Sequence, residues 1–103
     1  QEFDKTMQLA QAVKLVRFMS QNQLIELIAD QAVEKLLEFD LVAKGGTTAQ
    51  IIDQAIDLAE EELFREVAHM DSMLALTLNF ESIRIYVWER VINKIFKRKM
   101  HFK

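Results

Sequence analysis

The stretch QLIELIADQAVEKLLEFDLVAKGGTTAQ, residues 23–50, contains the most hydrophobic pattern of the chain, its only two glycines and a helix-start signal. Its apolar residues recur at spacings of three and four, which predicts a helix from Gln23 to Lys44. Gly45 suits the left-handed position that ends a helix, and Thr47 with Gln50 can form a capping box that starts the next one. We therefore place the main break of the chain at residues 44–47.

The rest of the chain is also typical of helix. Proline is absent and glycine occurs only at the break, so the turn residues that a sheet needs at each hairpin are missing. Ser20 and Gln23 form a second possible capping box, and Asn79 is a reasonable start for a last helix. Asp71 could either cap a new helix or lie inside a long one. The prediction is an all-α fold of about four helices, most simply an antiparallel bundle.

The apolar surface of the second predicted helix is wider than one stripe. A helix of this kind must be buried on more than one side, and a small bundle can bury few residues all round. We therefore expect a partner or a second subunit to complete the burial. The residues chosen for the buried set are Leu24, Ile28, Leu36, Phe39, Ile52, Leu63 and Trp88.

Length and composition limit the possible classes. The 103 residues suit a single helical domain, residues 1–103, or a piece of a larger protein, which is the expectation because the chain opens at Gln1. Cysteine is absent, which excludes thiol chemistry and disulfides and favours an intracellular location in an unspecified compartment. No run approaches the roughly 20 apolar residues of a bilayer-spanning helix, so no transmembrane segment is predicted.

Positive charge is concentrated at the end of the sequence. Residues 80–103 hold seven Lys or Arg against two Asp or Glu, whereas the preceding residues hold six against fourteen. A helical wheel centred on Trp88 places Ile85, Val91, Ile92, Ile95 and Phe96 together and the basic residues opposite. A basic amphipathic helix of this kind commonly docks on a partner, although an apolar stripe is also typical of a bundle core. The predicted partner-binding residues are Trp88, Val91, Ile92, Ile95, Arg90, Lys94, Lys97 and Arg98.

Trp88, Val91 and Ile95 have the spacing of one aromatic and two aliphatic anchors that enter an opened EF-hand lobe. Together with the hydrophobic segments 24–41 and 51–70, this pattern resembles the centrin-interacting region of the germinal-centre-associated nuclear protein family of mRNA-export scaffolds. The resemblance implies small helical subunits and centrin as partners. That family uses a continuous long helix, which Gly45 and Gly46 would interrupt.

Two further classes remain as alternatives. The last basic residues could neutralise phosphates of nucleic acid, or lie on a membrane surface, but the acidic pI of about 5.4 opposes both. Glu66 and His69 have the Glu-x-x-His spacing of di-iron bundles, which require two such motifs. Residues 60–62 are three successive glutamates that point in different directions and cannot share a reacting atom. We therefore predict no catalytic residues, no metal and no cofactor.

The leading prediction is a non-enzymatic helical protein–protein interaction or assembly domain. The alternatives are a scaffold segment that binds an EF-hand protein, such as centrin or calmodulin, through the last helix, and a nucleic-acid-binding helical protein. A monomer with Trp88 sealed inside and no exposed apolar patch would contradict the assembly prediction.

Overall fold

The computed structural model describes residues 5–41 and 44–98. These residues form five α-helices and one short 3-10 helix, and the described part of the chain contains no strand. The all-α prediction is therefore confirmed. The elements are α1 (Lys5–Leu15), η1 (Val16–Phe18), α2 (Gln21–Glu38), α3 (Thr48–Met70), α4 (Ser72–Thr77) and α5 (Phe80–Lys97).

Side-chain caps begin four of these helices. Both capping boxes form: the hydroxyl of Ser20 accepts from the Gln23 N–H at 3.2 Å, and that of Thr47 accepts from the Gln50 N–H at 3.1 Å. Asn79 caps α5 by accepting from the Ser82 N–H at 3.3 Å. These three predicted starts are confirmed.

Asp71 resolves the alternative that the sequence left open. It is both the C-cap of α3 and the N-cap of α4, where its carboxylate accepts a hydrogen bond from the Leu74 N–H at 3.1 Å. The chain turns there instead of continuing as one long helix.

The end of α2 differs from the prediction. The helix ends at Glu38, six residues before Lys44, because Asp40 takes the left-handed backbone conformation with φ 50°. The Leu41 N–H then donates to the Leu36 carbonyl at 3.2 Å and the Asp40 N–H to the Leu37 carbonyl at 3.3 Å. This is a Schellman motif, with an aspartate where glycine is usual. Buried Leu41 packs into the same core as Leu36, which fixes the turn.

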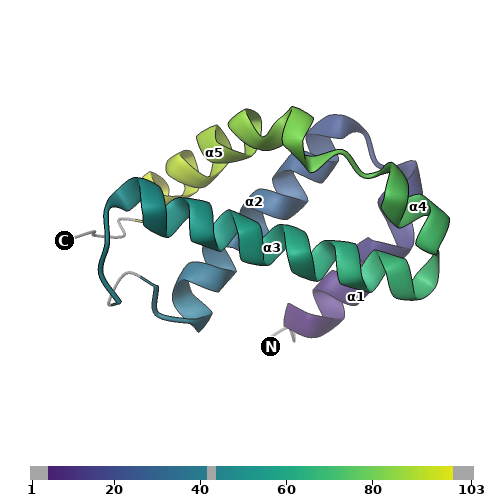
Figure 1. Cartoon of the computed structure of the whole chain (residues 1–103), viewed down its shortest axis with the longest axis horizontal. Coiled ribbons are helices and arrows are strands. Elements are labelled where there is room, and N and C mark those ends of the chain that lie inside the picture. Colours follow the sequence, from purple (N-terminus) through teal and green to yellow (C-terminus); the bar gives the residue numbers. More distant parts are fainter. Residues whose placement is uncertain (1–4, 42–43, 99–103) are drawn as a thin grey trace.

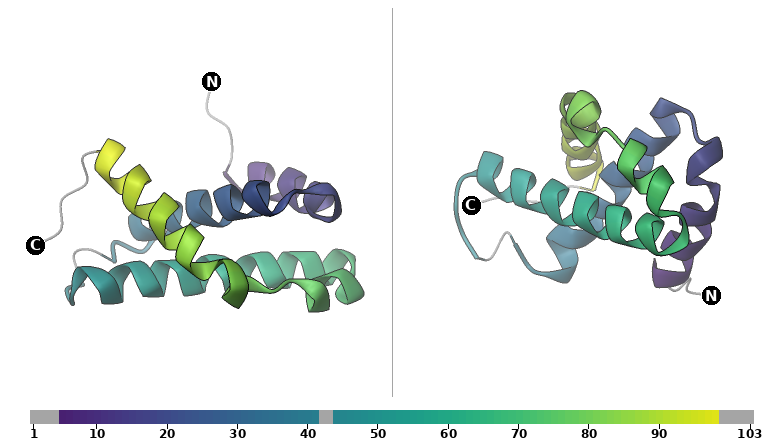
Figure 2. Two further views of the ribbon diagram at one scale, coloured as in Figure 1. Left: turned by 90° about the horizontal axis from the view of Figure 1, so that it is seen from above. Right: turned by 45° about the vertical axis from the view of Figure 1, so that its right-hand side comes forward.

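The helices pack in two layers that one helix crosses. Figure 1 shows α3, the longest helix, in front of α2, and Figure 2 shows α1 and α2 in one layer and α3 in the other. The last helix, α5, runs obliquely across both layers and packs on α2 and α3. The α1–α2 corner and α4 lie at the same end of the molecule.

One continuous core joins these elements. Its members share helical spacing on the inward face of each helix, and α2, α3 and α5 supply most of them. The apolar residues that these three helices bury are Ile25, Ile28, Ala29, Ala32, Val33 and Leu36 in α2, Ile51, Ile52, Ala55, Ile56, Ala59, Leu63 and Val67 in α3, and Ile83, Val87, Val91 and Ile95 in α5.

The predicted buried set is confirmed in part. Ile28, Leu36, Ile52 and Leu63 are buried, whereas Leu24 and Trp88 are only partly buried and pack at the edge of the core. The prediction was wrong for Phe39, which is 44% exposed. Because α2 ends at Glu38, Phe39 leaves the inward face, and its ring lies against the Lys35 ammonium, 5.6 Å from the ring centroid.

Candidate functional site

The inward face of α5 is apolar and fully used by the fold. Ile83, Val87, Val91 and Ile95 recur every fourth residue and are buried against α2 and α3. Val91 and Ile95, which the sequence suggested as anchors for a partner, therefore belong to the core of this structure.

Two cations of α5 are paired with carboxylates of α2. Arg90 forms a hydrogen bond and ion pair with Glu26, while Lys94 binds Glu26 at 3.0 Å and Asp30 at 2.8 Å. The hydrogen bonds from Lys94 and Arg90 lower the pKa of the Glu26 carboxyl. The hydrogen bond to Asp30, helped by the one to Glu26, raises the pKa of Lys94 against the opposing effect of its partial burial. These charges hold α5 to α2.

The opposite flank of α5 is held to α3. Arg84 lies within salt-bridge distance of three carboxylates, at 3.3 Å from Asp53, 2.9 Å from Asp57 and 3.2 Å from Glu60. The Trp88 indole N–H donates to Asp53 at 2.9 Å. The acidic first half of α3 is therefore partly neutralised by the last helix.

Glu60 is the least exposed of these carboxylates. Its burial raises the pKa of the carboxyl; the nearby Arg84 guanidinium opposes the shift and the nearby Asp57 carboxylate adds to it. One flank of α5 thus contacts a carboxyl whose charged form is disfavoured by burial, and among the described residues only the Arg84 guanidinium opposes this effect.

Two of the four basic residues predicted to bind a partner are therefore already paired within the chain. Arg90 and Lys94 bind α2, and of the predicted basic residues only Lys97 and Arg98 are exposed. Lys99 and Lys103, the other cations of this region, lie outside the described residues. A nucleic acid would have to compete with these intramolecular carboxylates for Arg90 and Lys94.

The outward face of α5 carries a second apolar stripe. Ile85, Ile92 and Phe96 are 68%, 47% and 86% exposed, and their spacing of seven and four residues places them on one side of the helix. Trp88 lies at the edge of this stripe, between the outward face and α3. The structure divides the group that the helical wheel placed together, because Val91 and Ile95 lie in the core while Ile85, Ile92 and Phe96 face outward.

This arrangement affects the EF-hand alternative directly. An EF-hand lobe that grips Trp88, Val91 and Ile95 together must draw α5 out of the core, because Val91 is fully buried and Ile95 nearly so. It must also break the ion pairs to α2 and α3. The outward stripe, in contrast, is accessible without any rearrangement.

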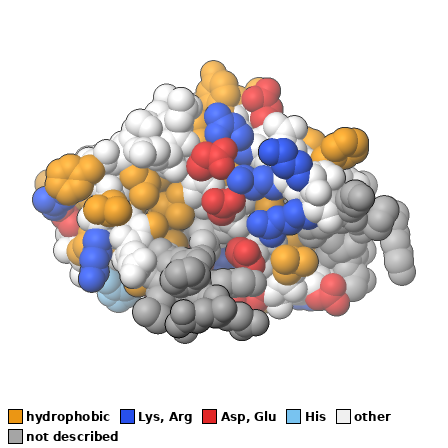
Figure 3. Space-filling model, turned by 180° about the vertical axis from the view of Figure 1, so that it is seen from behind, with side chains coloured by type: hydrophobic (Ala, Val, Ile, Leu, Met, Phe, Trp, Pro, Cys, Tyr) orange, Lys and Arg blue, Asp and Glu red, His pale blue; other side chains and the backbone are white. Residues whose placement is uncertain are grey.

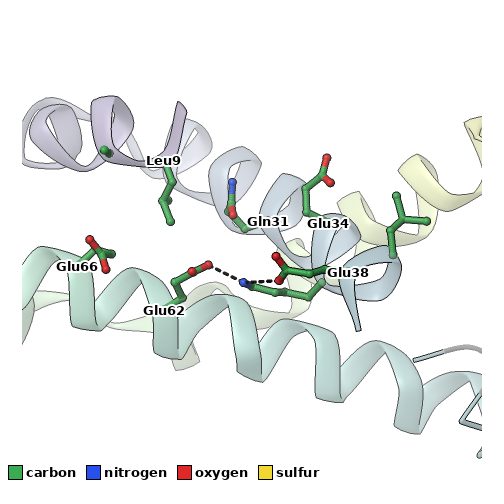
Figure 4. Close-up of a pocket in the computed structure, with 9 residues that line it drawn as sticks. Leu9, Gln31, Glu34, Glu38, Glu62 and Glu66 are labelled. Carbon is green, nitrogen blue, oxygen red and sulfur yellow. Dashed lines mark hydrogen bonds and ion pairs between the residues drawn. The ribbon is translucent and has the colours of Figure 1, made fainter. Parts of the chain in front are cut away.

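A separate crevice between α1, α2 and α3 is lined by four glutamates. Figure 4 shows Glu62 of α3 and Glu38 of α2 pointing at the Lys35 ammonium, with distances of 2.8 and 3.2 Å. Glu34 and Glu66 complete the acidic lining. Partial burial opposes the charged form of Lys35, but the hydrogen bonds to Glu62 and Glu38 outweigh it and raise the pKa of the ammonium. Lys35 therefore stays protonated and cannot act as a general base at neutral pH.

Glu66 and His69 are both exposed near the end of α3. Among the described residues, no group of three or more His, Cys, Asp or Glu side chains is placed to hold a metal ion.

The sequence did not reveal Lys35 or the carboxylate partners of Arg84, Arg90 and Lys94. Their partners lie 24 to 68 residues away in the sequence, except for Glu38, so no local spacing reports them. The available signal was the charge imbalance itself, since a basic final helix in an acidic chain can bind that chain.

The fold and these surfaces define a small all-helical domain with an outward apolar stripe on its last helix. None of the described helices combines the length and apolarity needed to cross a membrane. No family model, curated protein or solved structure matches the chain.

Proposed function

We propose that this chain is a non-enzymatic helical assembly domain that binds an amphipathic helix of another polypeptide through the outward face of α5. The observation that supports this proposal is the exposed stripe of Ile85, Ile92 and Phe96 on a helix whose opposite face is already buried. Exposed large apolar side chains that line up in this way are typical of interaction sites.

The gain from covering this stripe is substantial. Full burial of one large apolar side chain stabilises by about 1.5–3 kcal/mol, and Phe96 is almost entirely exposed in the free chain. Trp88 supplies additional apolar surface beside Ile92, and aromatic residues are enriched among those that dominate binding energy.

The geometry of the stripe suggests a helix as the occupant. Positions 85, 92 and 96 follow the period of an α-helix, so a partner helix lying along α5 can contact all three at once. Lys97 and Arg98 are exposed at the C-terminal end of the stripe, so acidic residues at the matching end of the partner would fit there.

The test compares the native mass of the tagged protein in extracts of its source cells with the mass of the recombinant chain alone. The double variant Ile92→Ser, Phe96→Ser should shift the tagged protein from a larger complex to the mass of the recombinant chain alone, because it removes the apolar contact. Size-exclusion chromatography with light scattering measures this shift. The matched control is Asn93→Ser, an exposed polar position on the same helix, which should leave the complex intact.

An identical mass for the wild type, the double variant and the recombinant chain would contradict the proposal. Circular dichroism of the double variant separates loss of binding from loss of folding, since both substituted side chains are exposed.

A further inference from the structure

A second group of exposed apolar side chains lies at the end of the molecule formed by the α1–α2 corner and α4. They are Leu15, Phe18, Met70, Met73 and Leu76, with exposed fractions of 57%, 76%, 45%, 72% and 73%. We call these five residues the apolar end. It is built from different elements than the outward stripe of α5.

The Arg17 side chain shows that the apolar end is one surface. Its guanidinium lies over the Phe18 ring, 6.0 Å from the centroid, and binds the Asp71 carboxylate at 3.0 Å. Asp71 is the residue between Met70 and α4, so η1 and α4 are neighbours. Met73 and Leu76 are three residues apart and share a face of α4.

A groove opens beside the apolar end. Its apolar lining comes from Leu15, Phe18, Met19 and Leu27, and its polar rim includes Glu26 and Asp30. Figure 3, seen from behind, shows a group of hydrophobic side chains at the left, the end that holds the α1–α2 corner, and mixed acidic and basic side chains in the middle of the face. The same end of the molecule therefore carries both an apolar projection on α4 and an apolar hollow beside η1.

We propose that the apolar end joins a second copy of this chain in a two-fold dimer, with Met73 and Leu76 of each copy entering the groove of the other. A two-fold interface uses the same surface on both copies, so that surface must be complementary to itself. A projection and a hollow side by side satisfy this condition. So does the neutral Arg17–Asp71 pair, whose two charges can face the opposite charges of a second copy without net repulsion.

The exposed apolar area of the apolar end is large enough for one side of a dimer interface. Five large side chains, four of them more than half exposed, offer on the order of several hundred Å² of apolar surface. Each partner in a stable interface contributes about 800 Å² in total, of which rather more than half is nonpolar. Methionine at two of the five positions allows the side chains to adapt to the groove. This dimer goes beyond the α5 surface proposed above and does not depend on it.

The test uses two variants of the full chain that carry opposite charges on the two sides of the proposed contact. Sedimentation equilibrium measures the dimerisation of each variant alone and of their mixture. Leu76→Glu places a carboxylate on the projection, where the apolar lining of the groove cannot solvate it, and Leu15→Lys places a cation in that lining. Each variant alone should weaken dimerisation by at least about tenfold, as expected for loss of a central contact. An equimolar mixture should recover a heterodimer close to wild-type strength, because the new Glu of one copy meets the new Lys of the other.

The control is Phe96→Ser, which changes an equally exposed apolar residue on α5 and should dimerise as the wild type does. A wild-type chain that stays monomeric at about 100 µM, far above the micromolar range in which interfaces of this size bind, would overturn the proposal. So would a Leu76→Glu variant that dimerises normally, or a mixture that associates no better than the separate variants. A monomeric recombinant chain that still forms an α5-dependent complex in cells would overturn the dimer alone and leave the proposed function standing.

Discussion

Asp40 holds a backbone conformation that most residues avoid. Its φ of 50° lies in the left-handed region, which costs an L-residue roughly 1 kcal/mol relative to glycine. Aspartate tolerates this region better than most residues, yet it still carries a Cβ. The turn persists because Leu41 is buried beyond it and two backbone hydrogen bonds close it.

Replacing this residue should therefore stabilise the protein. Asp40→Gly is expected to raise the free energy of unfolding by about 0.5–1 kcal/mol, because glycine adopts positive φ without steric cost. Urea denaturation followed by circular dichroism measures the change. Asp40→Ala is the control and should lower the stability instead, and equal effects of the two variants would show that φ is not the cause.

The same residue explains why the end of α2 could not be predicted from the sequence. The two glycines offered the obvious stop, and the apolar pattern continued through Leu41 to Lys44. The actual stop depends on burying Leu41 in the core that α2 shares with α3 and α5, and this tertiary burial outweighs the local preference for glycine. The two capping boxes, in contrast, are local signals, and both were predicted correctly.

At the scale of elements, α5 is attached to α2 by an ion-pair group whose strength depends on pH. The pKa of Glu26 is lowered in the folded chain, so its contribution is present above the ordinary pKa of glutamate and is lost as the pH falls through the lower folded value. The pKa of Lys94 is raised, so its contribution is present below the ordinary pKa of lysine and is lost as the pH rises through the higher folded value. The attachment is complete near neutral pH.

Glu26→Gln should test this attachment. The side chains involved are partly exposed, so the expected loss is only about 0.5–1 kcal/mol at pH 7. The difference between variant and wild type should shrink in acid, as the pH falls through the lowered folded pKa of Glu26 and the carboxyl becomes protonated in both states. Glu89→Gln, an exposed glutamate on α5, is the control and should change little. A difference in the free energy of unfolding that stays the same in acid would contradict the role of the Glu26 charge.

The orientation of α5 was the main part of the candidate site that the sequence could not determine. Ile83, Val87, Val91 and Ile95 form one apolar stripe, while Ile85, Ile92 and Phe96 form another. Periodicity alone does not say which stripe enters the core. The carboxylates of α2 and α3 distinguish the two faces, because they bind Arg84, Arg90 and Lys94 on the flanks of the buried stripe.

At the scale of the whole molecule, core and surface should respond very differently to the loss of a large apolar side chain. Leu63 is buried at the centre of α3, so Leu63→Ala should lower the free energy of unfolding by about 2–5 kcal/mol through lost burial and the cavity left behind. Phe96→Ala, at an exposed position, should change it by no more than about 0.5 kcal/mol in the isolated chain. Thermal or urea denaturation of both variants measures the contrast, and similar losses would contradict the assignment of Phe96 to the outside.

The acidic and basic parts of the sequence are not separated from each other in the folded chain. The acidic early residues and the basic last helix neutralise one another where α5 crosses α2 and α3. Without α5, the helices α2 and α3 would present carboxylates that lack their partner cations beside an uncovered apolar surface. Because α5 covers this surface, a premature stop codon ahead of residue 80 should destabilise the fold more than the length of the missing piece suggests.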